Sequence, residues 1–157
     1  MKNLIKFLIN AKKNTYANGD ATKVNSSRLC SKDYHYSEKI EDKQFAYHDT
    51  YFGGEKFIGE EVVYIDNKPY WAMNYYGNTI NPDLSEEFMD NALRPALMKV
   101  GEDKNILPLR GPSQFVNEDS KYTFIVDGTL ENFKGVEKIY IKDELVYELN
   151  CHGGIIK

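Results

Sequence analysis

The sequence predicts an α+β fold in which a mainly antiparallel sheet of about six strands carries two helices on one face. Three observations lead to this prediction. Aromatic and β-branched segments of strand length recur from residue 44 onward, and links of hairpin length join most of them. Two helical segments interrupt this pattern, so the order is helix, three strands, helix, three strands.

Residues 3–14 are predicted to form an amphipathic helix. Leu4, Phe7, Leu8 and Ala11 recur at helical spacing, with Lys and Asn between them. The run is apolar enough for a signal peptide, but Lys6 interrupts it and no small-residue cleavage site follows. We expect the helix to pack its apolar stripe on the sheet.

The first group of strands is predicted at residues 44–52, 57–65 and 69–77, as a three-stranded meander. Gly53-Gly54 and Asp66-Asn67-Lys68 supply the turns. Residues 18–42 are rich in Asn, Ser, Lys and Asp without clear periodicity, which indicates a loop with one edge strand at about 34–36.

The second half repeats the alternation of helix and strands. A helix is predicted near residues 83–100, kinked at Arg94 by Pro95, and a rigid loop with two prolines at 107–113. Strands follow at 121–126, 136–142 and 145–151. We expect no internal repeat, linker or low-complexity tract, and therefore a single globular domain over residues 1–157.

Composition excludes several classes of protein. The net charge is −4, whereas binding to nucleic acid through phosphates needs a clustered basic face, so we do not expect direct nucleic-acid binding. No segment has the apolar length to cross a bilayer. The two cysteines, Cys30 and Cys151, lie too far apart in sequence to suggest a disulfide framework, which favours a cytoplasmic protein.

Glu60 and Glu61 are two consecutive carboxylates in an otherwise apolar strand. Because side chains alternate, one points to each face of the sheet. With a turn at Asn67-Lys68, Glu61 would lie opposite Asn74 on the wet face, and Glu60 would lie opposite Tyr75. A carboxylate on the apolar side needs a partner, and such groups concentrate at functional sites.

Two further segments could complete a site. Arg110, on the proline-stiffened loop, offers a pre-organised fork for a carboxylate or phosphate, or a tie from the loop to Glu60 or Glu61. His152, at the end of the last strand, precedes two glycines, Gly153 and Gly154, whose amides could bind an anion. A solvent-facing terminal histidine is the simpler explanation.

Common catalytic and metal-binding signatures are absent from the sequence. No phosphate-binding loop, dinucleotide fingerprint, nucleophile elbow or His-Glu-x-x-His motif occurs. The three histidines and two cysteines lack zinc-site spacing, so we expect no metal and no cofactor. The chain is rich in tyrosine, with 12 Tyr against 1 Trp, and about half of the strand aromatics must point outward. These suit a planar ligand, cross-strand pairing or a protein interface.

Several runs together are similar to a small bacterial family catalogued only as a domain of unknown function. They are Tyr51-Phe52-Gly53, residues 57–63, residues 69–77, Arg110-Gly111-Pro112, residues 132–137, residues 147–149 and His152-Gly153-Gly154. Members of that family also occur behind helix-turn-helix domains of the XRE type. The resemblance implies no established activity, but fusion to regulators favours a sensory, ligand-binding role. Cys151 stands where the pattern has an aromatic residue.

The leading hypothesis is a non-enzymatic module that binds a small anionic molecule, for example a nucleotide-like one. Arg110 and the amides of Gly153 and Gly154 would bind the anion, Trp71 and Tyr75 the planar part, and Glu60 a donor group. The alternatives are a hydrolase or lyase that uses Glu60 or Glu61 with His152 and Arg110, and a protein-interaction domain, such as a homodimer, with exposed tyrosines. Coordinates that show whether Glu60, Arg110 and His152 converge would test the first two hypotheses, and sizing in solution at different concentrations would test the third.

Overall fold

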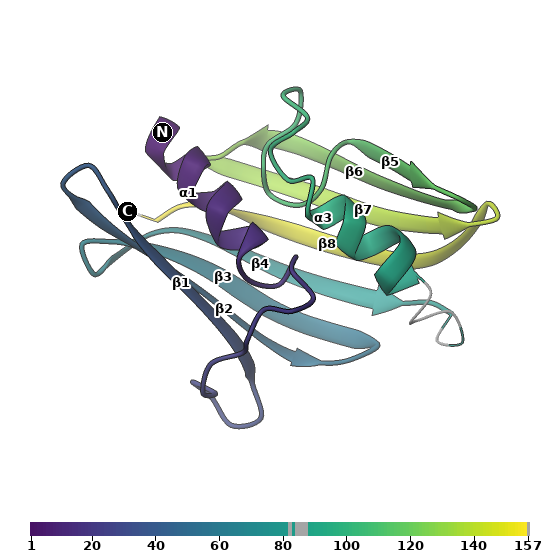
Figure 1. Ribbon diagram of the computed structural model, residues 1–157, viewed down its shortest axis with the longest axis horizontal. Coiled ribbons are helices and arrows are strands. Elements are labelled where there is room, and N and C mark those ends of the chain that lie inside the picture. Colours follow the sequence, from purple (N-terminus) through teal and green to yellow (C-terminus); the bar gives the residue numbers. More distant parts are fainter. Residues whose placement is uncertain (82, 84–87, 157) are drawn as a thin grey trace.

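A single antiparallel sheet runs through the whole chain in the computed structural model, which describes residues 1–81, 83 and 88–156 (Figure 1). The predicted α+β class with helices on one face is confirmed, but the sheet has eight strands, where about six were predicted. The strand order is β1-β2-β3-β4-β8-β7-β6-β5. The strands are β1 (Lys32–Ile40), β2 (Lys43–Gly53), β3 (Lys56–Ile65), β4 (Lys68–Thr79), β5 (Gln114–Asn117), β6 (Ser120–Thr129), β7 (Asn132–Ile141) and β8 (Glu144–Ile155).

The prediction falls short at the two outer strands: β1 was expected only as a short edge strand at about 34–36, and β5 was not expected. β1 covers nine residues where the sequence indicated three, and β5 covers four residues that directly follow the proline loop. Each pairs with a single neighbour, β2 or β6. Edge strands carry polar side chains and need no continuous apolar run, so their sequence signal is weak.

Two helices occupy the same face of the sheet. α1 (Lys2–Lys13) buries Leu4, Phe7, Leu8 and Ala11, as its periodicity predicts, and the Phe7 ring lies 5.1 Å from that of Phe45. In the second helical segment a π-helical turn, η2 (Met89–Leu93), leads into α3 (Arg94–Leu97). The change of helix type at Arg94 agrees with the irregularity predicted from Pro95. Residues 82 and 84–87 of this region lie outside the described part.

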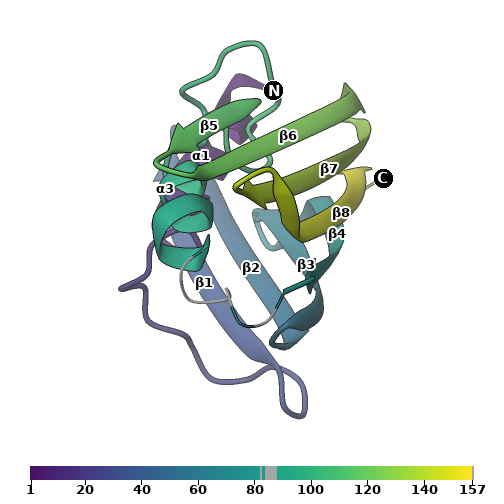
Figure 2. The ribbon, with the colours of Figure 1, turned by 90° about the vertical axis from the view of Figure 1, so that its right-hand side faces the viewer.

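The sheet curves strongly, so that its two outer ends approach each other around the helices (Figure 2). We call the face that holds α1 and α3 the concave face, and the opposite one the convex face. The core fills the concave side and includes Trp71, Tyr47, Tyr122 and Phe124, all 1% exposed or less. Within the described residues, no helix is long and apolar enough to cross a membrane.

The expectation that the chain has no internal repeat is wrong. Residues 57–77 and 133–153 share the same pattern 76 positions apart, and β3-β4 and β7-β8 occupy mirrored places in the strand order. The identical pairs are Phe57 and Phe133, Gly59 and Gly135, Glu61 and Glu137, Tyr64 and Tyr140, Ile65 and Ile141, Asn74 and Asn150, and Gly77 and Gly153.

Structural details repeat in the same way. A bulge separates Val63 from Tyr64 in one half and Ile139 from Tyr140 in the other. The hairpin turns at 66–67 and 142–143 all have positive φ, from 48° to 66°. Across the centre of the sheet, Trp71 stacks on Phe133 at 5.7 Å and, symmetrically, Tyr147 stacks on Phe57 at 6.3 Å. The fold is therefore two related halves joined at β4 and β8.

The predicted register of the β3-β4 hairpin is wrong, because the turn lies earlier than predicted and a bulge follows Val63. The turn residues are Asp66 and Asn67, one position earlier than predicted, and Glu61 lies opposite Met73 while Glu60 lies opposite Asn74. A shift of one residue exchanges the two faces of a strand. The wet-face carboxylate is therefore Glu60, and Glu61 is the one that enters the core.

Candidate functional site

In the described part of the chain, five acidic or basic side chains are buried on the concave face, between the sheet and the helices. They are Lys12 of α1, Asp49 of β2, Glu61 of β3, Arg110 of the proline loop and Glu137 of β7, each 5% exposed or less. Charges removed from water are costly unless they are paired and hydrogen-bonded. How these five side chains pair therefore decides what the face can do.

Lys12 and Glu61 form an ion pair that is completely buried. Burial lowers the pKa of Lys12, while the charge of Glu61 and the hydrogen bond to it act in the opposite direction. The Lys12 Nζ atom also lies 3.4 Å from the hydroxyl of Tyr16 and 5.9 Å from the centre of the Trp71 ring. This pair ties helix α1 to the middle of the first half of the sheet.

Arg110 and Glu137 form the corresponding pair in the second half. The Arg110 Nε and Nη2 atoms each donate to one oxygen of Glu137 at 2.9 Å, in the bidentate geometry that suits a guanidinium. The hydroxyls of Tyr122 and Tyr147 also donate to Glu137, at 2.7 and 3.1 Å. Burial alone would lower the pKa of Arg110, but Glu137 raises it well above its usual range.

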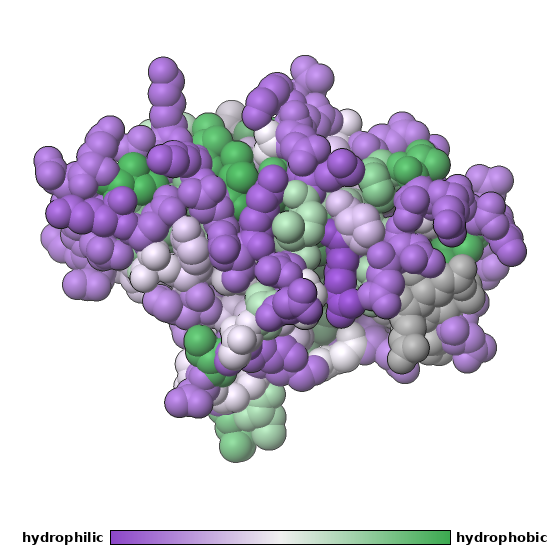
Figure 3. Space-filling view, viewed as in Figure 1, coloured by the Kyte–Doolittle hydropathy of each residue, from purple (hydrophilic) through white to green (hydrophobic). Residues whose placement is uncertain are grey.

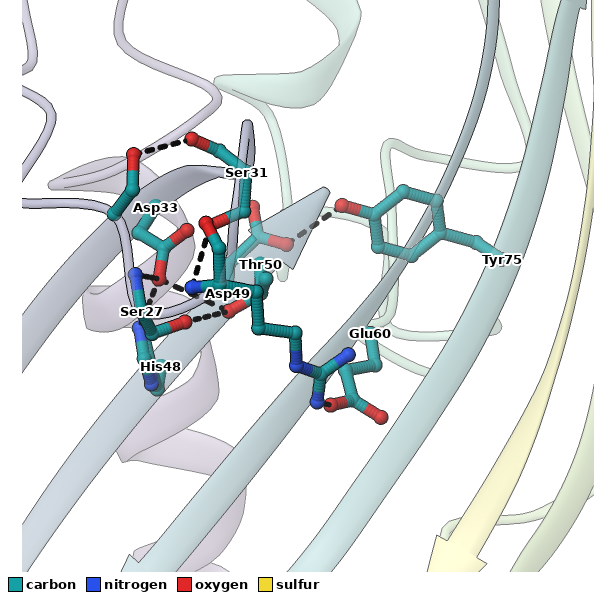
Figure 4. Close-up of polar contacts among 10 residues, drawn as sticks. Ser27, Ser31, Asp33, His48, Asp49, Thr50, Glu60 and Tyr75 are labelled. Carbon is teal, nitrogen blue, oxygen red and sulfur yellow. Dashed lines mark hydrogen bonds and ion pairs between the residues drawn. The ribbon is translucent and has the colours of Figure 1, made fainter. Parts of the chain in front are cut away.

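Asp49 is the fifth member of the cluster. Its Oδ1 atom accepts a hydrogen bond of 2.6 Å from the hydroxyl of Tyr75, on β4 (Figure 4). Within the described part of the chain, its Oδ2 atom accepts none. Burial, followed by the nearby charge of Glu61, raises the pKa of Asp49 to about 7, although Tyr75 and Lys12 oppose the shift. A carboxyl group with this pKa can accept or donate a proton near neutral pH.

Asp49 and Tyr75 line a cavity of about 640 Å³ on the concave face. The volume lies within the range of about 300 to 1,000 Å³ that is usual for small-molecule sites. Arg110, Tyr16 and Tyr147 also line its inner part, and Phe57, Phe88 and Leu97 supply apolar wall. Tyr34 and Tyr51 stack on each other with ring centres 6.4 Å apart on another wall.

The exposed charged residues that line this cavity are two lysines, Lys23 and Lys32, and one carboxylate, Glu55. Arg94, whose side chain is 43% exposed, also lines the cavity and pairs with Asp90. Lys32 also donates to the carbonyl of Gly53 at 2.8 Å. The helix-bearing face around the cavity is largely hydrophilic, with small apolar patches (Figure 3). The outer part of the cavity therefore favours a negatively charged group.

Two of the predicted site residues, Tyr75 and Arg110, line this cavity. Glu61 lies in the same buried cluster but behind the cavity wall, where it holds Lys12. Trp71 is fully buried: its Nε1 atom donates to the carbonyl of Leu130 at 3.1 Å and its ring stacks on Phe133. Trp71 is thus a core residue without access to a ligand in this structure.

Glu60, Asn74 and His152 lie together on the convex face, on three adjacent strands. Glu60 is opposite Asn74, and Asn74 is opposite His152. Two strand spacings, about 10 Å, therefore separate Glu60 from His152. Glu60 pairs with Arg28 instead. The three segments predicted to converge are divided between the two faces, so this geometry does not join Arg110 and His152 at one centre.

Gly153 and Gly154 are part of β8 rather than an anion-binding turn. Gly153 pairs with Met73 on one side and Phe133 on the other, and Gly154 pairs with Ala72 and Asn132. A Cβ atom on Gly153 would lie 2.1 Å from the carbonyl oxygen of Ala72. These glycines allow neighbouring strands and the Phe133 ring to approach closely.

A second polar cluster, which the sequence did not indicate, surrounds Asp33 on the convex face (Figure 4). The Oδ2 atom of Asp33 accepts from the amide of Ser27 at 3.0 Å, contacts His48 Nε2 at 2.9 Å and accepts from Thr50 at 3.3 Å. Burial would raise the pKa of Asp33, but hydrogen bonds from Ser27, Ser31 and His48 hold it well below its usual range.

The Asp33 cluster anchors the segment before β1 to the convex face. Ser27 and Arg28, which pairs with Glu60, belong to that segment, and its lack of periodicity hid the contact from sequence reasoning. Within residues 1–81, 83 and 88–156, no group of three or more His, Cys, Asp and Glu side chains is arranged to hold a metal ion.

Comparisons with known proteins give a family but no activity. The family model described as "Domain of unknown function (DUF5680)" matches residues 49–156, which include residues 49–53 of β2, all later strands and every residue of the inner cavity except Tyr16. Neither the curated proteins nor the solved structures gave a match. The match covers more than half of the chain, and the chain therefore belongs to the DUF5680 family of domains of unknown function.

Proposed function

We propose that this protein is a binding module for a small anionic molecule with a planar part, of nucleotide-like character, and that the ligand occupies the concave cavity. The single observation that carries the proposal is the combination of an aromatic-walled cavity of about 640 Å³ with a predominantly basic mouth. Lys23, Lys32 and Arg94 would attract the anion, while Tyr34 and Tyr51 offer ring surface.

The role of Arg110 in this proposal differs from the one predicted. The Nε and Nη2 atoms of Arg110 already donate hydrogen bonds to Glu137, and the two opposite charges nearly cancel. An anion at the guanidinium would have to compete with the charge of Glu137, which already neutralises it. We therefore assign anion binding to the exposed cations, and to Arg110 the task of holding the proline loop and the inner wall in place.

A thermal-shift panel of nucleotides, sugar phosphates and aromatic carboxylates tests the proposal, because a ligand that binds only the folded state raises the melting temperature. The double variant Lys23→Ala/Lys32→Ala should weaken binding of any hit about tenfold, since each exposed charge pair contributes roughly 0.5 to 1 kcal/mol. The matched control, Lys134→Ala/Lys142→Ala, also removes two exposed lysines, but away from the cavity. A panel without a single hit, or equal losses in both double variants, would overturn the proposal.

A protein-interaction role is a second candidate, favoured by a row of apolar side chains on the convex face. Ile58, Tyr76 and Ile125 are 56%, 47% and 72% exposed. They lie with Val136 on one line across neighbouring strands, which the exposed Asn150 of β8 interrupts between Tyr76 and Val136. In this reading the partner is a second copy of the chain. Sizing over a wide concentration range, with Tyr76→Ser/Ile125→Ser as the variant, would show a dimer that the variant abolishes, whereas a monomer at all concentrations would rule it out.

A further inference from the structure

The charges of the concave cluster do not balance among themselves. Lys12 is matched by Glu61 and Arg110 by Glu137, each in direct contact. Asp49 remains, and the hydrogen bond that it accepts among the described residues comes from a neutral donor, the hydroxyl of Tyr75. An ionised Asp49 thus leaves one uncompensated negative charge at the inner end of the cavity, where a positively polarised ligand group would be stabilised.

Comparison of the two halves indicates that this charge is not part of the common architecture. The carboxylates Glu61 and Glu137 occur in both halves, each with a buried cation. On β2, Asp49 is the partner of Glu61, whereas on β6 the partner of Glu137 is Phe124. Tyr75 likewise corresponds to Cys151, 76 positions later. A polar pair therefore stands in the first half where the second half has an apolar pair.

The second half shows that the fold does not need a carboxylate at this place. Phe124 and Cys151 are 1% and 3% exposed and pack beside Gly135 as ordinary core residues. A buried carboxylate destabilises the folded state, and its retention at the wall of a cavity is typical of a functional site. Asp49 is 2% exposed and lines that cavity.

The cavity thus has an acidic inner end and a basic mouth. We propose that Asp49, oriented by Tyr75, accepts a hydrogen bond from a nitrogen donor of the ligand, and that the cavity selects planar molecules with N–H donors at one end and an anionic group at the other. A nucleoside monophosphate has this chemistry, with its base inward and its phosphate among Lys23, Lys32 and Arg94. This inference rests on the function proposed above and adds the orientation and class of the ligand.

The test compares ribose 5-phosphate with the 5′-monophosphates of adenosine, guanosine, cytidine and uridine at pH 8, in amide-NMR titrations. At least one nucleotide should bind ten times more tightly than ribose 5-phosphate. Asp49→Asn keeps the size of the side chain but removes its charge, and should reduce that advantage about tenfold or more, because charge-assisted hydrogen bonds are the stronger ones. Its effect on ribose 5-phosphate should be less than twofold.

Asp127→Asn is the matched control, since Asp127 is 79% exposed and lies away from the cavity. It should leave all affinities unchanged. If nucleotides bind no better than ribose 5-phosphate, or keep their advantage in Asp49→Asn, the inference is wrong while anion binding at the mouth stands. If none of the five compounds binds and the thermal-shift panel is also without a hit, the proposed function fails as well.

Discussion

The two halves of the molecule share one design and differ at one place. Both bury a glutamate on their third strand and neutralise it with a cation from outside the sheet. Both also have a glycine on their fourth strand that lies against an aromatic ring of the third strand. Only the first half adds Asp49 and Tyr75. The shared features hold the fold, and the difference lies at the binding site that we propose.

The shared glutamates nevertheless have unequal partners, because a lysine can lose its proton in the folded state and an arginine cannot. Glu137→Gln should therefore destabilise the protein by about 3 to 5 kcal/mol, the usual cost of leaving a buried charge unpaired. Glu61→Gln should cost less, about 1 to 3 kcal/mol. Chemical denaturation at pH 7 measures both free energies of unfolding.

The pH dependence sharpens this comparison of the two pairs. Burial lowers the pKa of Lys12, and loss of Glu61 should lower it further. The cost of Glu61→Gln should then shrink as the pH rises and Lys12 becomes neutral, whereas that of Glu137→Gln should stay constant. Glu148→Gln, in a half-exposed pair with Lys138, is the control and should cost less than 1 kcal/mol. Equal costs for the two buried glutamates at every pH would contradict this account.

The equivalent glycines Gly59 and Gly135 provide the next test. A Cβ atom on Gly59 would lie 2.5 Å from both the carbonyl oxygen of Thr50 and the hydroxyl of Tyr75, whereas on Gly135 the nearest atom, of Phe124, is at 2.9 Å. Gly59→Ala should cost about 2 to 3 kcal/mol and Gly135→Ala about 1 kcal/mol, since overpacking against backbone is hard to relieve. Thermal or chemical denaturation measures the loss of stability in both variants. A larger loss for Gly135→Ala than for Gly59→Ala would contradict this prediction.

Asp49→Asn should change the free energy of unfolding in the opposite direction, and by an amount that depends on pH. The pKa of Asp49 is raised from 3.8 to about 7 in the folded state, so the folded state binds more protons than the unfolded state between these values. The free energy of unfolding of the wild type should therefore fall as the pH rises from about 4 to 7. The variant lacks this loss, so its stability relative to the wild type should increase from pH 5 to pH 8. A difference that is independent of pH would show that Asp49 is ionised normally.

The sequence predicts the helix and most of the strands well, because amphipathic spacing in residues 3–14 and β-prone runs after residue 44 are strong signals. It misses the side of the sheet to which each carboxylate points. One bulge after Val63 exchanges Glu60 and Glu61, and a bulge has no reliable mark in sequence. The repeat escapes notice because identity is limited to the few positions that pack or turn. Asp49 belongs to no recognisable sequence motif, and only its burial in the structure distinguishes it from the exposed aspartates.

The most direct test of the central claim, that the difference between the halves marks the binding site, is a map of amide shifts on titration with the tightest nucleotide. We expect the perturbed amides to cluster around Lys23, Lys32, Asp49, Gly54 and Tyr75, with little change at the equivalent positions Phe124 and Cys151. Perturbations centred on Asn74 and His152 of the convex face, with the concave residues unchanged, would contradict the account.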